Sequence, residues 1–156
     1  MSCRFALRIF LIALLSAAPA AARDIALVAN KSTPADSMTL AELVKVCKAQ
    51  TNRWPDGKPV TFIMRAPSAP EMTVVLQKVY GLSEGDVSNL IVHANHGRAN
   101  HPAILVVSSD EDLVNKVAST PGAVGVVDVY SINSSVAVVK IAGKLPLEPG
   151  YLLHGN

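Results

Sequence analysis

The stretch VTFIMRAPSAPEMTVVLQKVYG, residues 60–81, joins a strand pattern to a helix pattern within a few positions. The apolar, partly β-branched run Val60–Met64 is typical of a buried strand, and it ends at Arg65. Helical spacing of apolar residues then predicts a helix from about Ala69 to Tyr80, which Gly81 ends. A strand that leads directly into a helix is a building unit of α/β folds.

Arg65 and Ser68 lie at this junction, where chains often hold a small anion. In one interpretation, the Arg65 charge, the Ser68 hydroxyl and the free N–H groups of the helix bind an oxyanion. In the other, Ser68 is the N-cap of a capping box with Glu71, and Arg65 pairs with Glu71 or another acid. The second is favoured for Ser68, because the Glu71 carboxylate competes with an anion for the same helix dipole. For Arg65 both interpretations stay open.

Further strands and helices alternate along the chain and are joined by short loops. Capping pairs, such as Thr39 with Glu42 and Ser109 with Asp112, predict where helices begin. The expected strands are 24–30, 123–128 and 135–142, and the expected helices are 39–47, 83–94 and 110–119. This alternation predicts a single α/β domain over residues 23–142, followed by an extended C-terminal tail over 143–156.

The first 22 residues have the pattern of a cleaved export signal. Arg4 and Arg8 precede the apolar run Ile9–Leu15, and the small residues Ala20–Ala22 offer a cleavage site. The apolar run is too short to span a bilayer, which needs about 20 residues. We therefore expect a periplasmic protein that does not insert into the membrane once residues 1–22 are removed.

Charge and cysteine content narrow the functional classes. The full chain has 14 basic and 12 acidic residues, a net charge of +2, and this excess belongs to the signal. The mature chain is formally neutral, so no nucleic-acid partner is expected. Cys47 is the one cysteine left after cleavage, which excludes an intramolecular disulfide. Its helical spacing from other apolar residues predicts a buried core position.

Evidence for metal binding or catalysis is thin. His93 and His96 are three residues apart and could share a helix face as metal ligands, but neither carboxylate nor thiol accompanies them. We therefore expect solvated loop histidines, no metal and no cofactor. The sequence has no nucleophile-elbow, phosphate-loop or zinc-protease motif, so we do not expect an enzyme. The loop 93–102 is rich in hydrogen-bonding side chains and is a second candidate for a ligand or partner surface.

A third candidate is the loop after the first strand. Lys31, Ser32 and Thr33 offer hydrogen-bond donors there, and ligands of open α/β sheets sit at the carboxyl ends of strands. The same residue types are also ordinary in loops. Asp128, at the end of another expected strand, either faces the same edge or starts the next turn.

The ordered motifs resemble the periplasmic phosphate-type solute-binding proteins, which have a type 2 periplasmic-binding-protein-like fold. The motifs are Asn30 with its loop, the helix TLAELVKVCKA (39–49), the stretch NRWPDGKPVTFIMR (52–65), a serine-started helix, and STPGAVGVVD (119–128). The resemblance implies a periplasmic-binding-protein-like α/β sandwich with a mixed sheet flanked by helices. Family members that bind phosphate have two lobes around the ligand, and this chain corresponds to about the later half. One lobe is therefore expected.

The chain departs from the family at the anion motif. Phosphate binders have Arg-x-x-Ser-Gly-Thr, in which the arginine, the hydroxyls and the backbone N–H groups surround the oxyanion. Here Arg65 and Ser68 match, but Ala69 replaces the glycine and Pro70 replaces the threonine. Pro70 removes both a hydroxyl and a backbone donor.

Two functions are consistent with these observations. The first is an exported solute-binding-like domain that binds a small anion such as phosphate as part of uptake or sensing. The alternative is an interaction module without a ligand, accessory to a membrane sensor or transporter.

Overall fold

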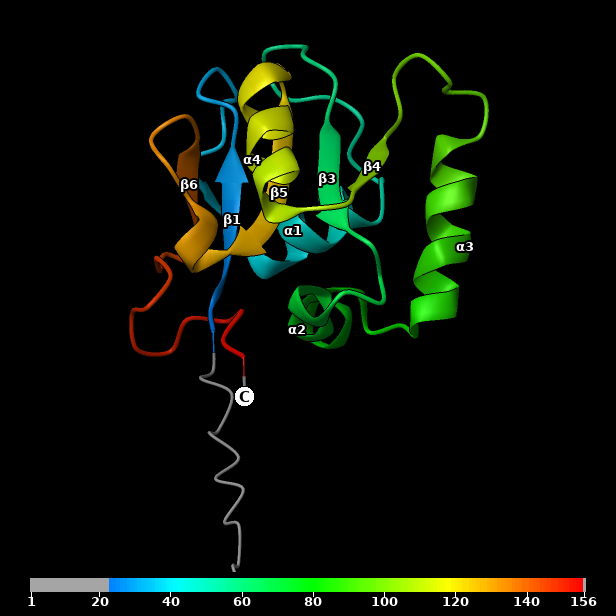
Figure 1. The fold of residues 1–156 in the computed structure, drawn as a ribbon. Helices are drawn as coiled ribbons and strands as arrows, with labels where there is room; N and C mark the ends of the chain where they lie inside the picture. Colours follow the sequence, from blue (N-terminus) through cyan, green and yellow to red (C-terminus); the bar gives the residue numbers. More distant parts are fainter. Residues whose placement is uncertain (1–22, 156) are drawn as a thin grey trace, which may run out of the picture.

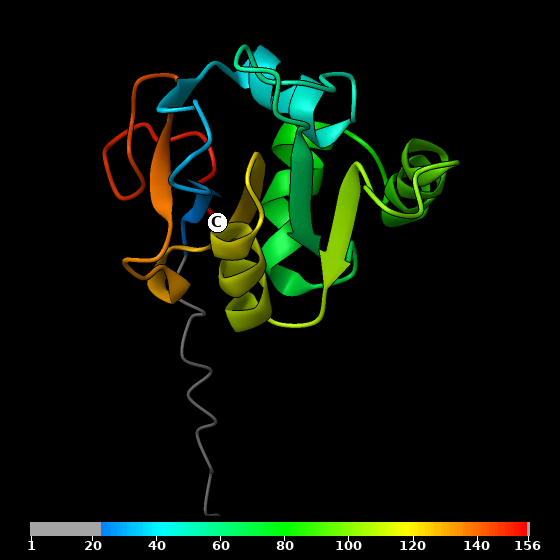
Figure 2. The ribbon, with the colours of Figure 1, turned by 90° about the horizontal axis from the view of Figure 1, so that it is seen from above.

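The computed structural model describes residues 23–155, which fold into a six-stranded mixed sheet with helices on both faces (Figures 1 and 2). The strand order is β2-β6-β1-β5-β3-β4. The strands are β1 (Ile25–Ala29), β2 (Ser37–Met38), β3 (Thr61–Arg65), β4 (Ile104–Val107), β5 (Ala123–Asp128) and β6 (Ala137–Ile141). The longer helices are α1 (Leu40–Cys47), α3 (Glu84–Asn95) and α4 (Asp110–Ser119). This is the expected α/β sandwich with a mixed sheet.

The direction of β5 decides which loops meet at each end of the sheet. β5 runs antiparallel to β1, with Ile25 opposite Asp128, and parallel to β3. β3 is also parallel to β4. The carboxyl ends of β3, β4 and β5 therefore lie together along one edge of the sheet, which we call the Arg65 edge. The carboxyl end of β1 lies at the opposite edge.

Side chains of the central strands alternate between two cores, as the two-residue period of a strand requires. In β1, Leu27 points into the larger core against α1 and the 70–80 segment, and Val28 points into the smaller core under α4. All five residues of β1 are buried. Buried on both faces, such a strand reads as a continuous apolar run in the sequence.

Three helix starts and one helix end are confirmed where they were expected. Thr39 and Glu42 form a complete capping box at the start of α1. Ser83 and Ser109 cap α3 and α4, each through a side-chain oxygen that accepts a backbone N–H. Gly81 has φ +60°, the left-handed conformation in which helices commonly end.

The segment predicted as one helix from 69 to 80 is helical but irregular. It begins as a 3-10 turn (Pro70–Met72), continues through α2 (Thr73–Val75) and ends as a π-helical stretch (Leu76–Tyr80). Pro70 lacks the N–H that a regular first turn would use, and this favours an irregular start. The apolar side of the segment is still buried in the larger core.

Two short edge strands were not predicted, because neither has a readable alternation. β2 lies at the end of the loop that was expected after the first strand, and β4 follows the expected loop 93–102. β4 forms one edge of the sheet, and α3 stands beside it in both views (Figures 1 and 2). Asn95, at the end of α3, donates to the Ile104 carbonyl and accepts from the Ile104 N–H, and so holds the start of β4.

The C-terminal segment differs from the expected extended tail. Residues 143–155 form turns that pack against the start of β1. Leu153 is fully buried, its carbonyl accepts the Ile25 N–H, and the Tyr151 hydroxyl donates to the Ile25 carbonyl. The apolar side chains of Tyr151 and Leu153 pack the segment against the domain. The sequence did not predict this packing, because isolated apolar residues among turn residues form no recognisable pattern.

The expected export signal, residues 1–22, lies outside the described residues. Within residues 23–155, no helix has the length and apolar character needed to cross a bilayer.

Candidate functional site

Arg65 occupies the end of β3, and its guanidinium is bound by a carboxylate of the same chain. Arg65 Nη1 donates to Asp110 Oδ1 over 2.7 Å. The Ser131 hydroxyl donates to the other oxygen of Asp110 over 3.0 Å. Both side chains of the ion pair are largely buried, with 19% and 21% of their surfaces exposed. Asp110 thus holds the guanidinium much as a bound anion would.

The fold explains why these residues meet. Asp110 begins α4 directly after β4, Ser131 lies in a 3-10 turn (Val129–Ser131) directly after β5, and both strands run parallel to β3. Their ends therefore converge on Arg65. Asp110 and Ser131 could not be identified as site residues from the sequence, because nothing local to either residue indicates a contact with position 65.

Glu71 is a second carboxylate beside Arg65. Its Oε1 lies 3.6 Å from Arg65 Nη1. Its Oε2 is buried and has no hydrogen-bond partner among the described residues. Arg65 therefore forms ion pairs with two acidic side chains, Asp110 and Glu71.

The predicted capping box at Ser68 and Glu71 is wrong. The turn begins at Pro70, so Ala69 is in the N-cap position and no side chain caps it. Ser68 is exposed and precedes the turn. Attraction to Arg65 draws the Glu71 carboxylate away from the backbone N–H groups that it would have to reach as a cap.

Asp128 holds a second arginine at the same edge of the sheet. Arg23 Nη1 donates to Asp128 Oδ2 over 3.0 Å, and this hydrogen bond raises the pKa of the Arg23 guanidinium. The guanidinium carbon lies 5.7 Å from the centre of the Tyr130 ring, within the range of a cation–π contact. The Tyr130 side chain is otherwise open to solvent, with 73% of the residue surface exposed.

Lys31, Ser32 and Thr33 lie at the opposite end of the sheet from Arg65. The Thr33 hydroxyl donates to the Ala123 carbonyl, and Ala123 begins β5. The Ser32 hydroxyl donates to the Asn30 side chain. Lys31 is exposed. The structure therefore does not bring these residues together with Arg65 and Ser68 around one small ligand.

His93 and His96 are both exposed, in the last turn of α3 and just after it. Among residues 23–155, no group of three or more histidine, cysteine, aspartate or glutamate side chains is placed to hold a metal ion.

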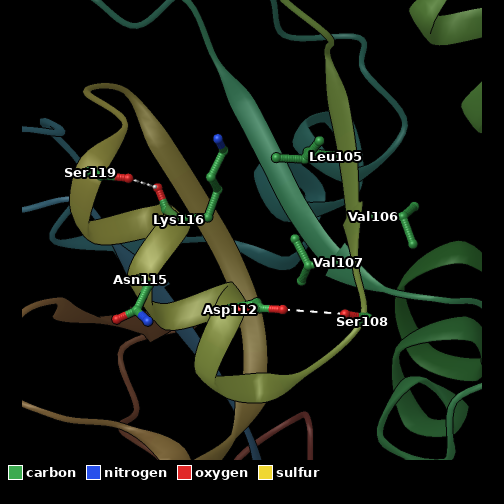
Figure 3. Close-up of a pocket in the computed structure, with 8 residues that line it drawn as sticks. All are labelled: Leu105, Val106, Val107, Ser108, Asp112, Asn115, Lys116 and Ser119. Atoms are coloured by element: carbon green, nitrogen blue, oxygen red, sulfur yellow. Dashed lines mark hydrogen bonds between the residues drawn. The ribbon is translucent and has the colours of Figure 1, made fainter.

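One surface hollow lies between β4 and α4, next to the Arg65 edge (Figure 3). Its volume is about 560 Å³. Leu105 and Val107 of β4 face the polar side of α4, where Asp112 accepts a hydrogen bond from Ser108. Lys116 is the single cationic residue in its lining, which does not include Arg65. The hollow therefore offers no clustered positive charge for an anion.

A family model described as a PBP (periplasmic-binding-protein) superfamily domain matches residues 15–148. The chain belongs to the PBP superfamily. A search of curated proteins gives no match. Several solved structures share the fold of this PBP domain at low sequence identity.

An ABC-type phosphate transport receptor from Vibrio cholerae is 18% identical, with a TM-score of 0.69, and the match covers 86% of this chain and 54% of the receptor. PstS from Borrelia burgdorferi is 14% identical, with a TM-score of 0.65 and coverages of 86% and 55%. A phosphate-binding protein from Stenotrophomonas maltophilia is 15% identical, with a TM-score of 0.61 and coverages of 80% and 40%. The PBP domain thus spans about half the length of these proteins, as expected for one lobe.

Proposed function

We propose that this PBP domain is an exported, non-catalytic component of a solute-uptake or sensing system and that it acts as an interaction module for a membrane transporter or sensor. The observation that carries the proposal is the occupation of Arg65 by Asp110 at 2.7 Å. A free anion at this position must displace a carboxylate that is already desolvated and hydrogen-bonded by Ser131. The internal carboxylate therefore lowers the affinity for free phosphate at Arg65.

The surface around Arg65 supports the interaction role. The resemblance to phosphate binders implies a second lobe that encloses the ligand, and this chain spans about half the length of such a receptor. The exposed Tyr130 directly precedes Ser131 in the chain and therefore lies close to Arg65. Aromatic side chains are enriched in protein interfaces, where they supply large contact areas.

Phosphate binding at Arg65 is the second candidate function. It is favoured by the structural relatives, which are described as phosphate receptors or phosphate-binding proteins. Arg65 and Ser68 are the two retained residues of the family's anion motif. Under this alternative, Asp110 swings away and the anion takes its place on the guanidinium.

Calorimetric titration with phosphate and sulfate at low ionic strength separates the two candidates. The purified protein is compared with Arg65→Ala and with Asp110→Asn. We expect no heat in the unchanged protein that depends on Arg65. Asp110→Asn removes the competing charge and should increase anion affinity at Arg65.

Saturable heat in the unchanged protein that disappears in Arg65→Ala would establish the phosphate-binding function instead. Heat that survives in Arg65→Ala arises from another part of the molecule and does not bear on this choice.

The partner itself is sought by photo-crosslinking in the cell envelope. A photoreactive amino acid at position 130 should give an adduct with a membrane protein, which mass spectrometry then identifies. The same amino acid at position 92 is the control, because Val92 is 69% exposed on α3, the helix that stands beside the edge strand β4 (Figure 1). Identical adducts from both positions, or none from either, would contradict an interface at the Arg65 edge.

A further inference from the structure

A second hollow lies at the other end of β3, about 13 Å along the strand from Arg65. It has a volume of about 540 Å³ and is formed by residues 52–53, 59–61 and 97–102. Small-molecule sites in proteins commonly have volumes of about 300–1,000 Å³. The hollow is therefore large enough for a small organic molecule, and a single inorganic anion would fill a minor part of it.

The lining of this hollow carries positive charge and no carboxylate. Arg53, Arg98 and His101 contribute to the lining, together with neutral side chains. Arg53 Nη1 donates to the Gly57 carbonyl over 2.9 Å, and Arg98 Nη2 donates to Asn52 Oδ1 over 3.3 Å. Both acceptors are uncharged, so these bonds orient the guanidinium groups without neutralising them.

Arg53 and Arg98 differ from Arg65 and Arg23 in having no acidic partner in the described part of the chain. Arg65 and Arg23 each form an ion pair with an aspartate at the opposite edge of the sheet. Within residues 23–155, no ion pair involves Arg53 or Arg98. Two guanidinium groups that share one hollow and lack an acidic partner attract an anionic ligand.

The segments that carry the two arginines are fixed to the body of the domain. Asn95 bonds both backbone groups of Ile104, which closes the loop containing Arg98 at its base. The Val60 N–H donates to the Asn52 carbonyl over 3.0 Å, which holds the strand-like segment of Arg53 against the start of β3. The cost of ordering these segments on binding a ligand is therefore reduced.

We infer that this hollow binds a small organic molecule through its phosphoryl group. A phosphoryl dianion has three terminal oxygens, which match the paired N–H donors of two guanidinium groups better than a singly charged carboxylate does. The side chains of Asn52, Asn100 and Thr61 in the lining can hydrogen-bond hydroxyl groups of the ligand's organic part. This site is independent of Arg65 and of the proposed interaction function.

Amide shifts in two-dimensional NMR spectra of the purified protein test the inference. The protein is titrated at constant ionic strength with glycerol 3-phosphate, with inorganic phosphate and with glycerol. Saturable shifts are expected for Thr61 and for residues 97–101 with either phosphoryl compound, and no shifts with glycerol. Glycerol 3-phosphate is expected to bind more tightly than inorganic phosphate, because its organic part also contacts the lining, and tighter binding of the free anion would contradict an organic ligand.

Arg53→Gln and Arg98→Gln should each weaken binding by about tenfold or more, because each removes a charge-assisted contact. Lys140→Gln is the matched control: Lys140 is exposed on β6, and its loss changes the net charge equally. This control should leave the affinity within about twofold. The spectrum of each variant also reports whether the variant is folded.

Three results would overturn the inference. Shifts that grow linearly without saturation would mean unspecific screening of surface charge. Shifts centred on residues 65–71 would place the anion at Arg65. Equal affinities for the arginine variants and the control would exclude both guanidinium groups as ligands.

Discussion

Arg65 and Asp110 are 45 positions apart in the sequence, and their contact places a carboxylate on the guanidinium that an anion at Arg65 would have to bind. Arg65 itself could be picked out from the sequence, because it ends a strand pattern and precedes a helix pattern. Its partner could not be, since the contact depends on the parallel pairing of β3 with β4. Pairings of distant strands are set by the whole fold and leave no local pattern.

The Arg65–Asp110 pair should stabilise the fold measurably. Asp110→Ala leaves a largely buried guanidinium without its closest partner and should lower the free energy of unfolding by about 1–3 kcal/mol. Urea denaturation gives the value. Glu111→Ala is the control, because Glu111 is exposed in the same first turn of α4 and its loss should cost less than about 0.5 kcal/mol. Equal costs would show that the pair contributes only through the helix dipole.

The buried side chains of Cys47 and Tyr80 should make the folded protein less stable at alkaline pH. Burial raises the pKa of the Cys47 thiol above its ordinary value of 9.0 and that of the Tyr80 hydroxyl above 10.0. Above pH 9 the thiol of the unfolded chain loses its proton while the folded chain retains it. The free energy of unfolding should therefore be constant below this pH and fall above it, by up to about 1.4 kcal/mol per pH unit for each group.

Denaturation curves at a series of pH values from 7 to 11 measure this effect. Cys47→Ala should start from a lower stability, because it removes buried volume, but should lose less stability between pH 9 and 10. An unchanged slope in that interval would mean that the thiol does not contribute.

At the scale of single elements, the sequence predicted best where helices begin and end. Thr39, Ser83 and Ser109 begin helices because their side-chain oxygens accept backbone N–H groups within three residues. Ser68 has the same residue type and spacing, yet it does not cap, because Arg65 holds Glu71 and Pro70 starts the turn late. At Ser68 the capping pattern thus fails next to an arginine that attracts the carboxylate of the expected pair.

Gly122 connects α4 to β5 in a conformation that a side chain would disrupt. Its φ is +82°, and a Cβ atom would lie 2.2 Å from the carbonyl oxygen of Pro59. The Gly122 carbonyl also accepts the indole N–H of Trp54. Gly122→Ala should therefore destabilise the fold by more than about 2 kcal/mol, since backbone strain and a steric clash add.

The melting temperature of Gly122→Ala gives the result, with Gly85→Ala as the matched control. Gly85 lies in α3 with open space around it, and alanine favours a helix, so this change should be neutral or stabilising. A Gly122→Ala protein as stable as the control would mean that the 121–123 turn can shift away from Pro59.

The whole domain depends on its C-terminal segment. Leu153 is fully buried against the start of β1, so Leu153→Ala should lower the free energy of unfolding by about 2–4 kcal/mol. Leu147, in the same segment, is 66% exposed, and Leu147→Ala should cost less than about 0.5 kcal/mol. Equal small effects in chemical denaturation would mean that the segment is an appendage after all.

At this scale the family resemblance predicted the architecture, and the length of the chain predicted one domain. The sequence did not show how residues 143–155 pack, because turn-rich segments carry no periodic pattern. It also did not separate the candidate ligand residues, since Lys31 and Arg65 both follow strands. Only the antiparallel direction of β1 against β5 places them at opposite edges.

The position of β1 has a consequence for the order in which the chain can fold. β1 comes first among the strands, yet its neighbours in the sheet are β5 and β6, and its first residue also bonds to Leu153. β1 therefore cannot pair with its neighbours until the last quarter of the chain, which contains β5 and β6, has been synthesised. Such distant pairings slow folding, and a nascent chain whose sheet forms late would remain unfolded long enough for the proposed export.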